Sequence, residues 1–273
     1  MAFERAIVEG NFSTYSGPGW PRYVPQDYAQ AREWYEKAAA LKHAGAQFSL
    51  GNLYLQGWGV PQCYATAFEW FERAVSQDHL PAQFGLGLLY ERGWGTEQNY
   101  DQACAWYLKA AERGLAAAQS KLGVMYHNGS GVPQDYATAR DWYEKAAAQG
   151  NAEAQGNLGA LYLAGFGCER DYPKAHALCL KAVAQDNAQG QVGLGTIYSN
   201  GLGVEQDHAK AREWYELAAA KGFVHGQAFL AKLLEHGHGG PTDHTRALEL
   251  YRAAAKQGSE YAKNALKRLG QPE

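Results

Sequence analysis

Apolar residues recur along this chain in register, at a fixed step of 36 residues. One series of paired bulky residues follows this step: Trp34-Tyr35, Trp70-Phe71, Trp106-Tyr107, Trp142-Tyr143, Leu178-Cys179, Trp214-Tyr215 and Leu250-Tyr251. A second series keeps the same step: Leu50-Gly51, Leu86-Gly87, Leu122-Gly123, Leu158-Gly159, Leu194-Gly195 and Leu230-Ala231. Because no spacing drifts between residues 25 and 269, the pattern predicts an uninterrupted repeat architecture.

One part of each period has the pattern of an amphipathic helix, which we call the A helix. Its apolar positions in residues 46–56 recur at helical spacing: Ala46, Leu50, Leu53 and Tyr54. Gly57 follows, and glycine suits the left-handed conformation that ends many helices. A glycine also stands inside most A helices, as Gly51 does here, at a cost of about 1 kcal/mol relative to alanine. We therefore expect close packing between helices to offset that cost.

The other part of each period predicts a second helix, the B helix, with its first example at residues 28–41. Its apolar face consists of Tyr28, Ala31, Trp34, Tyr35 and Ala38. Both residues of the aromatic pair fall on this face, so we expect both, Trp142 for example, to lie in the core. An Asp or Asn that can cap the helix precedes most B helices: Asp27, Asn99, Asp135, Asp171, Asp207 and Asp243. Cys63 takes this place once, and that cap should be weak.

Two columns of the repeat contain alanine in every period. They are Ala31, Ala67, Ala103, Ala139, Ala175, Ala211 and Ala247, and Ala38, Ala74, Ala110, Ala146, Ala182, Ala218 and Ala254. Small side chains allow close helix approach, and neither helix can bury its apolar face alone, so stacked helix pairs predict an all-α solenoid. We expect a degenerate N-terminal cap at residues 1–24, a leading B helix at 25–43, six repeats at 44–259 and a C-terminal capping helix at 260–273.

Two runs of sequence resemble one known family. The Leu-Gly-x-Leu-Tyr-x-x-Gly-x-Gly-Val run at residues 50–60 and the Asp-Tyr-x-x-Ala-x-x-Trp-Tyr-x-Lys-Ala-Ala run at 135–147 are similar to the Sel-one-like repeat, a branch of the tetratricopeptide superfamily. The resemblance covers about nine-tenths of the chain. It implies a right-handed superhelix of antiparallel helix pairs that acts as an adaptor for other proteins. Some members of the family neutralise secreted bacterial toxins.

Composition narrows the classes of partner. With 25 basic and 28 acidic residues, the net charge is −3, so the chain has no strong basic field for nucleic acid or an anionic membrane surface. No apolar run is long enough for a transmembrane helix. The four cysteines have irregular spacing, which predicts neither a disulfide framework nor a zinc site and favours a reducing compartment. We expect no cofactor and a cytoplasmic protein, or a periplasmic or secreted one if a native leader has been removed.

A Gly-x-Gly turn follows most A helices. The turns follow helices rather than strands and lack a subsequent Gly-Lys-Ser/Thr, so they are explained by turn geometry and not by phosphate binding. The residues between the glycines are Trp58, Trp94, Ser130, Phe166, Leu202 and His238. Two interpretations remain open: each side chain covers the neighbouring repeat, or the aromatic ones form a ridge for a partner.

Candidate chemistry is sparse. Four histidines gather near the C-terminal end, where they are either surface residues or ligands of a transition metal: His225, His236, His238 and His244. Their spacing fixes no ligand geometry, so we predict no metal site. The recurring Asp residues are accounted for as helix caps, and the cysteines occupy unrelated positions of the repeat. No nucleophile–base pair is indicated, and we predict no catalytic residue and no enzyme.

The candidate binding residues lie on the side of the A helices that faces away from the predicted core. They are Phe48, Asn52, Gln56, Phe84, Leu88, Arg92, Lys121 and Asn128, together with Trp58 and Trp94 at the turns. A partly apolar surface with a polar continuation suits a peptide or protein segment. The other interpretation is that Phe48 and Phe84 pack between repeats.

These patterns predict a non-catalytic scaffold or adaptor that binds a protein or peptide on the concave face, as a monomer or weak homodimer. One alternative is an immunity protein that neutralises a secreted toxin. A second is a hydrolase of the β-lactamase-like kind linked to cysteine-rich relatives, although their regular cysteine pairs are missing from this sequence.

Overall fold

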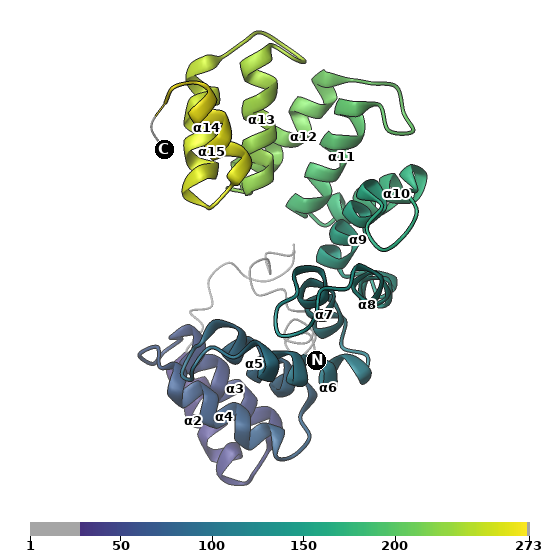
Figure 1. Ribbon diagram of the computed structural model, residues 1–273. Coiled ribbons are helices and arrows are strands. Elements are labelled where there is room, and N and C mark those ends of the chain that lie inside the picture. Colours follow the sequence, from purple (N-terminus) through teal and green to yellow (C-terminus); the bar gives the residue numbers. More distant parts are fainter. Residues whose placement is uncertain (1–27, 272–273) are drawn as a thin grey trace, which may run out of the picture. The chain divides into compact units, whose positions relative to one another are not determined.

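The computed structural model describes residues 28–271, and this range contains fourteen α-helices and no strand (Figure 1). The B helices are α2 (Tyr28–Ala40), α4 (Tyr64–Val75), α6 (Tyr100–Glu112), α8 (Tyr136–Ala148), α10 (Tyr172–Val183), α12 (His208–Ala220) and α14 (His244–Lys256). The A helices are α3 (Ala44–Gln56), α5 (Leu80–Arg92), α7 (Ala116–Asn128), α9 (Ala152–Ala164), α11 (Ala188–Asn200), α13 (Val224–His236) and α15 (Glu260–Arg268). The predicted all-α solenoid of helix pairs is confirmed.

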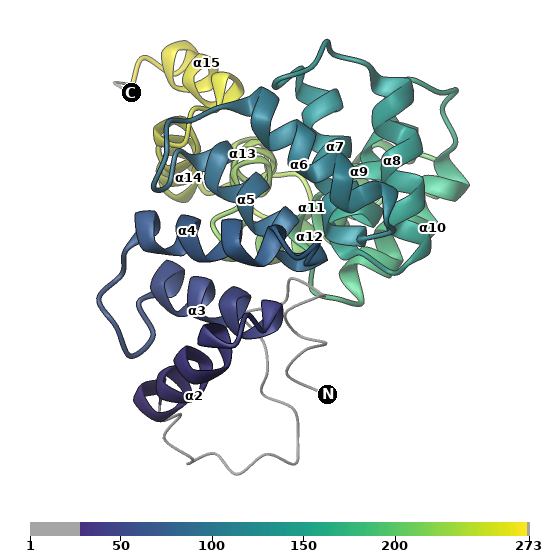
Figure 2. The same ribbon diagram turned by 90° about the horizontal axis from the view of Figure 1, so that it is seen from below.

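The chain forms two compact units that divide within α8, between Trp142 and Tyr143. We call residues 28–142 the N-terminal unit and residues 143–271 the C-terminal unit, and each is described by itself. Within each unit, helices that follow one another in the sequence pack side by side, joined by short loops (Figures 1 and 2). No helix in the described range combines the length and the apolar character needed to cross a membrane.

The A helices are enclosed by their neighbours on several sides. In the C-terminal unit, α11 packs against α10 and α12 and also contacts the A helices α9 and α13. The predicted close approach at the internal glycines is confirmed. A β-carbon added at Gly87 would lie 2.5 Å from Cε1 of Tyr107, and one at Gly195 would lie 2.4 Å from Cε1 of Tyr215. The adjoining B helix thus requires glycine at these positions.

The aromatic pairs of the B helices do not both enter the core, which corrects our prediction. The second residue is buried, as Tyr107 and Tyr143 are, but Trp106 and Trp142 are only half-buried. Successive helical residues point about 100° apart, so one apolar face cannot bury both rings fully. The outer tryptophans are covered in part by a cation one turn later, with Nζ of Lys109 lying 4.0 Å from the Trp106 ring centroid.

The predicted helix ends are confirmed where they are described. The side chains of Asn99, Asp171, Asp207 and Asp243 each accept a hydrogen bond from a backbone N–H in the first turn, whereas Asp27 lies outside the described residues. Cys63 makes no such bond at the start of α4, as expected. The A helices from α3 to α13 end at a glycine in the left-handed conformation.

A column of buried glutamines joins the repeats, and we did not predict it. Its members are Gln47, Gln83, Gln119, Gln155, Gln191 and Gln227. They donate to a carbonyl in the last turn of the preceding B helix, as Gln119 does to Ala111 at 3.1 Å, or to the loop before the A helix, as Gln83 does to Asp78 at 3.1 Å. Some also accept from a glutamine in the loop after the following B helix; Gln155, for example, accepts from Nε2 of Gln185 at 3.0 Å. A buried amide costs free energy unless it is bonded, so this column ties neighbouring repeats together at a defined register.

The same loops are held by a second contact whose chemistry varies between repeats. Where the left-handed loop residue is Asp78, Arg113 of the next repeat donates to its carboxylate at 2.8 Å. Lys221 donates to the left-handed Asp186 in the same way. Where the loop residue is Gly150, Gln185 donates to its carbonyl oxygen at 2.9 Å. At the same position of the repeat, an ion pair forms where the loop residue is Asp, and a side-chain amide donates to the backbone where it is Gly.

Candidate protein-binding surfaces

The residues inside the Gly-x-Gly turns pack on the preceding repeat. The Trp58 ring stacks on Tyr28 with centroids 5.5 Å apart, and the Trp94 ring stacks on Tyr64 at 5.0 Å. Both tyrosines are the first residues of B helices. Of the two interpretations, cover for the neighbouring repeat accounts for both rings, although Trp94 keeps 36% of its surface exposed at this edge.

Two predicted binding residues on α3 are buried. Phe48 is only 6% exposed and stacks on Phe71 of α4 at 5.4 Å, and Asn52 is 8% exposed. Phe84 is half-buried against Tyr107 of α6 at 5.4 Å. Phe48 and Asn52 are therefore not accessible to a partner in this conformation, and Phe48 belongs to a core cluster that also includes Ala82 and Leu86 of the next repeat. The reason is that neighbouring helices cover the A helices on more than the one side that a single apolar face suggests.

The other predicted residues remain accessible in the N-terminal unit. Gln56, Arg92 and Asn128 are exposed near the ends of α3, α5 and α7, and Leu88 is half-buried. The ammonium of Lys121 lies 3.4 Å from a carboxylate oxygen of Glu91, whose other oxygen accepts a hydrogen bond from the Tyr107 hydroxyl at 2.5 Å. Lys121 is thereby fixed in place and partly neutralised.

All exposed residues of the A helices α3 to α13 fall in four columns of the repeat, which we call the A strip. Asn52, Gly85 and Gly193 occupy these columns as well but are buried. An i, i+4, i+7, i+11 spacing keeps these columns within about 60° on a helix. The A strip consists of Gly45, Ser49, Asn52 and Gln56 on α3; Pro81, Gly85, Leu88 and Arg92 on α5; Ala117, Lys121, Val124 and Asn128 on α7; Glu153, Asn157, Ala160 and Ala164 on α9; Gln189, Gly193, Thr196 and Asn200 on α11; and His225, Phe229, Lys232 and His236 on α13. Every helix has a different set, whereas the buried leucine and glutamine columns next to it do not change.

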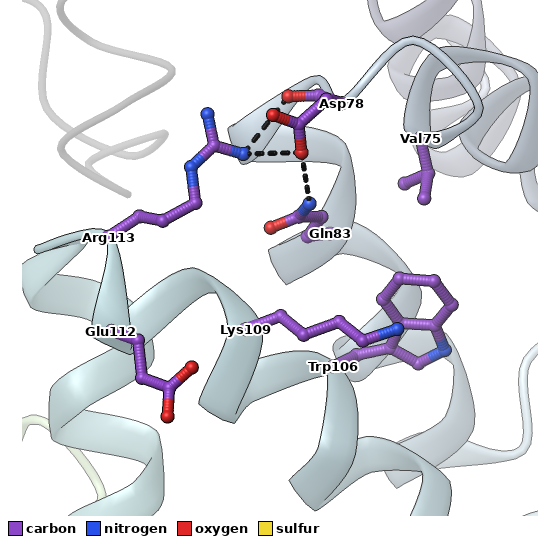
Figure 3. A pocket seen from close by; sticks show the side chains of 7 residues that line it. All are labelled: Val75, Asp78, Gln83, Trp106, Lys109, Glu112 and Arg113. Atoms are coloured by element: carbon purple, nitrogen blue, oxygen red, sulfur yellow. Dashed lines mark hydrogen bonds and ion pairs between the residues drawn. The ribbon is translucent and has the colours of Figure 1, made fainter.

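An open pocket of about 450 Å³ lies in the N-terminal unit, where the loop after α4 meets α5 and α6. It is lined by Val75, Asp78, Gln83, Trp106, Lys109, Glu112 and Arg113. Figure 3 shows Lys109 extended toward the Trp106 indole and Arg113 turned toward Asp78. Two acids face two bases, and one pair is already bonded, so the pocket offers no net charge. We had not predicted it, although a Trp followed by a cation three residues later recurs in the sequence.

The C-terminal histidines do not converge on one point. His208 and His238 stack with centroids 4.7 Å apart, and His236 lies 5.7 Å from His238. His225 instead contacts Phe229, at 6.2 Å. Within residues 28–271, no group of three or more His, Cys, Asp or Glu side chains is placed to hold a metal ion.

The ionisable groups of the described range act mainly in structural contacts. Hydrogen bonds from the hydroxyl and backbone N–H of Thr138 hold the pKa of Asp135 below its usual value, so this cap stays ionised. Burial raises the pKa of the Cys179 thiol to about 12 and that of Tyr215 to about 12. Such groups are poor nucleophiles or bases at neutral pH.

Comparison with protein-family models matches the Sel1 repeat seven times, at residues 16–43, 44–79, 80–115, 116–151, 152–187, 188–223 and 224–259. The first match includes residues for which we predicted a degenerate cap, and its part before residue 28 lies outside the described range. The comparison with curated proteins found no match.

Several solved structures are similar. A protective antigen of uropathogenic Escherichia coli strains with an SLR fold is 40% identical, with a TM-score of 0.68 over 86% of this chain and 50% of the antigen, so this chain spans half of the antigen's length. A Sel1 repeat protein from Oxalobacter formigenes is 33% identical, with a TM-score of 0.68 over 82% of this chain and 89% of that protein. An immunity protein from Pseudomonas aeruginosa is 22% identical over 93% and 90%, with a TM-score of 0.50, which shows a shared fold alone. Because the seven matches span residues 16–259, this chain belongs to the Sel1 repeat family.

Proposed function

We propose that this chain is a non-catalytic scaffold that binds a protein or peptide partner along the A strip. The supporting observation is the contrast between neighbouring columns of the A helices. The buried leucine and glutamine columns keep the same residue in every repeat from α3 to α13, while the A strip, which holds the exposed residues of these helices, changes from helix to helix. The buried column of Phe48 also varies, so the contrast rests on exposure together with variation. Residues that are not needed for packing between helices can differ between repeats and so determine which partner binds.

In the N-terminal unit, the proposed contacts are Leu88, Arg92 and Asn128, with Gln56 at one end and Trp94 at the turn edge. They combine an apolar side chain, a charge and amides, which is the mixture found at protein interfaces. The buried ring of Phe48 contributes by holding α3 against α4, not by touching the partner. A stable complex needs about 800 Å² from each side, so a partner would have to span several repeats.

The absence of catalysis is also part of the proposal. Among the described cysteines, Cys104 and Cys179 are buried, and burial raises the pKa of both thiols. The carboxylates of Asp135 and Asp207 accept backbone hydrogen bonds and cap helices. These groups serve the fold, which supports a binding function over a hydrolytic one.

Affinity capture from a lysate of the host cell tests this function. The variant Leu88→Ser/Arg92→Glu/Asn128→Arg changes the A strip of the N-terminal unit, and Glu72→Arg/Gln102→Arg makes comparable changes on exposed faces of α4 and α6. We expect the first variant to lose a partner by about tenfold or more, and the second to keep it. Circular dichroism checks that both variants fold. The proposed function would be refuted if the wild type, the first variant and a variant of the A strip in the C-terminal unit, Lys232→Glu/His236→Glu, all captured the partner equally.

Toxin neutralisation remains the alternative within the binding class, because one structural neighbour is named an immunity protein. The identity of the captured partner distinguishes the immunity function from the adaptor function. A secreted toxin whose activity falls on addition of this chain would favour the immunity function, and a signalling or assembly protein would favour the adaptor.

A further inference from the structure

The A strip of α13 differs in kind from the others in the C-terminal unit. It presents three basic or titratable side chains, His225, Lys232 and His236, and one aromatic ring, Phe229. The three basic residues are exposed and the ring is half-buried. The corresponding positions of α11 hold only glycine, amides and a threonine. The last full repeat is therefore where this unit gathers aromatic surface and positive charge together.

An aromatic platform forms the apolar part of this surface. Phe229 meets Tyr261 of α15 edge-on, with ring centroids 6.0 Å apart, and meets His225 in the same way at 6.2 Å. Tyr215 of α12 supports Phe229 from one side, at 5.5 Å. Tyr261 leaves 45% of its surface exposed. A bulky apolar side chain from a partner could cover these rings at little entropic cost, because they are already held in place.

The charge on the strip is not neutralised by its neighbours. Lys232 forms no ion pair with any residue in the described range. The acid of α13, Glu235, is already bonded to the Tyr251 hydroxyl at 2.9 Å and to Arg268 at 2.7 Å. Glu260 of α15 is paired with Lys263 at 2.6 Å, and α11 has no charged residue at all. Positive charge is thus left available beside the aromatic platform.

His236 adds a dependence on proton binding. Its Nδ1 lies 2.9 Å from the carbonyl oxygen of Lys232, and because a carbonyl only accepts, Nδ1 must carry a hydrogen. In the neutral ring Nε2 is then an acceptor and cannot bind a carboxylate. A protonated ring can donate from Nε2. Docking of an acid at this point therefore takes up a proton.

The charged and titratable groups around His236 come from each adjoining element. They are Lys232 and Glu235 of α13, His238 of the following turn, whose ring centroid lies 5.7 Å from that of His236, and His208 at the start of α12, which stacks on His238. Glu235 is the one acid among them, and it is already engaged by Tyr251 and Arg268. No unpaired carboxylate of these groups would therefore compete with, or repel, a carboxylate supplied by a partner.

From this arrangement we propose that the A strip of α13, with Tyr261, is the docking site for an acidic peptide segment that contains a bulky apolar residue. The apolar side chain covers Phe229 and Tyr261, and acidic side chains bond to Lys232 and to protonated His236. The proposal rests on the scaffold function and names the chemistry of the partner segment at this end of the chain.

Fluorescence anisotropy with a labelled peptide that alternates Glu with Leu and Trp tests the site on the full chain. We expect Lys232→Glu/His236→Glu to weaken binding by about tenfold or more, and Phe229→Ser to do the same. The matched control His244→Glu/Lys256→Glu makes the same charge changes on α14, outside the strip, and should bind like the wild type. Circular dichroism confirms that each variant folds.

The proton uptake gives a second readout. Wild-type affinity should rise about threefold to tenfold on acidification, because only the protonated ring can donate from Nε2, and His236→Gln should remove most of that rise while the affinity before acidification stays near that of the wild type. Equal binding of a peptide with Lys in place of Glu, equal loss in the α14 control, or no binding at either pH would overturn the proposal. If the α13 variants still capture the cellular partner while the N-terminal A-strip variant does not, this docking site fails and the scaffold function stands.

Discussion

Apart from the nine-residue α15, the A and B helices are 12 or 13 residues long, but they bury very different shares of their residues. In α3, eight residues are buried, among them polar Gln47 and Asn52. In α4 only Ala67, Phe71 and Ala74 are buried, and the rest of the helix faces water or a half-covered edge. An A helix has helices on several sides and keeps only the A strip accessible, whereas a B helix has a distinct inner and outer face. Contacts with neighbouring helices therefore fix the leucine and glutamine columns of an A helix, and its exposed residues are confined to one narrow strip.

The largest effect on stability is expected at the aromatic pair of α6, Trp106 and Tyr107. Tyr107→Ala should lower the free energy of unfolding by about 3–5 kcal/mol, because Tyr107 is fully buried, whereas Trp106→Ala should cost roughly half as much, since part of that ring is exposed already. Urea unfolding followed by circular dichroism measures both. Equal losses would mean that the inner and outer faces of the B helix are not distinct, as we first predicted for the pair.

The sequence allows most of this fold to be predicted, because a repeat displays its core as columns. The step of 36 residues, the glycine ends, the capping residues and the weak cap at Cys63 all followed from it. The limits predicted for the example helices at 46–56 and 28–41 were within two residues: α3 begins at Ala44 where we expected residue 46, and α2 ends at Ala40 where we expected residue 41. Local rules suffice here because each helix end depends on its own few residues.

The burial of single side chains was harder to predict. We placed Phe48 and Asn52 on an outer surface, because a helical wheel assumes one buried face and cannot show how many helices surround it. Trp106 was placed in the core because its column is aromatic. The glutamine column of Gln47 was overlooked since amides rarely lie in cores, although its recurrence in six periods was a visible signal of burial. These outcomes depend on packing between repeats, which sequence position alone does not show.

The glycines of the A helices provide a second test, of intermediate size. Gly87→Ala should lower stability by about 1–3 kcal/mol, since the new β-carbon would lie 2.5 Å from the Tyr107 ring and that clash outweighs the better helix propensity of alanine. Gly45, on the A strip, has only the flexible side chain of His43 nearby, at 3.1 Å. Gly45→Ala should be neutral or stabilise by up to about 1 kcal/mol in thermal unfolding. If both substitutions stabilise, the close approach of α5 and α6 is wrong.

A smaller effect is expected at α4, where the residue before the helix, Cys63, provides no side-chain cap. Cys63 has nearly the same backbone angles as Asn99, φ −146° against −148°, but its side chain accepts no bond from the first turn. Cys63→Asp should therefore stabilise by about 0.5–1 kcal/mol, and the reciprocal Asp207→Cys should destabilise by a similar amount. Thermal unfolding of both variants measures this. No gain from Cys63→Asp would show that the start of α4 cannot use a cap.

The smallest effect concerns the contact between the turn after an A helix and the preceding B helix. In the N-terminal unit this contact is the Tyr64–Trp94 stack, and near the C-terminal end it is the His208–His238 stack. Partial burial, followed by the nearby His208, His236 and Lys232, lowers the pKa of His238 below its usual 6.5. The unfolded chain then binds the proton more readily than the folded one, so the contribution to stability is complete above about pH 6.5 and declines as the pH falls through that value.

The lowered pKa of His238 predicts that the turn containing it becomes less stable as the pH falls. On going from about pH 7.5 to about pH 5.5, hydrogen-exchange protection, corrected for intrinsic rates, should fall in the turn at residues 237–243 and stay constant in the turn at 93–99, where the stacked rings do not titrate in this range. The double variant His208→Tyr/His238→Trp installs the N-terminal type of stack and should remove the pH dependence at residues 237–243. Retention of that dependence in the double variant would assign it to groups outside this stack. Because the Gly239 backbone lies directly against the start of α12, where an added β-carbon would meet the His208 carbonyl oxygen, a loosened stack should also expose the amides of that first turn.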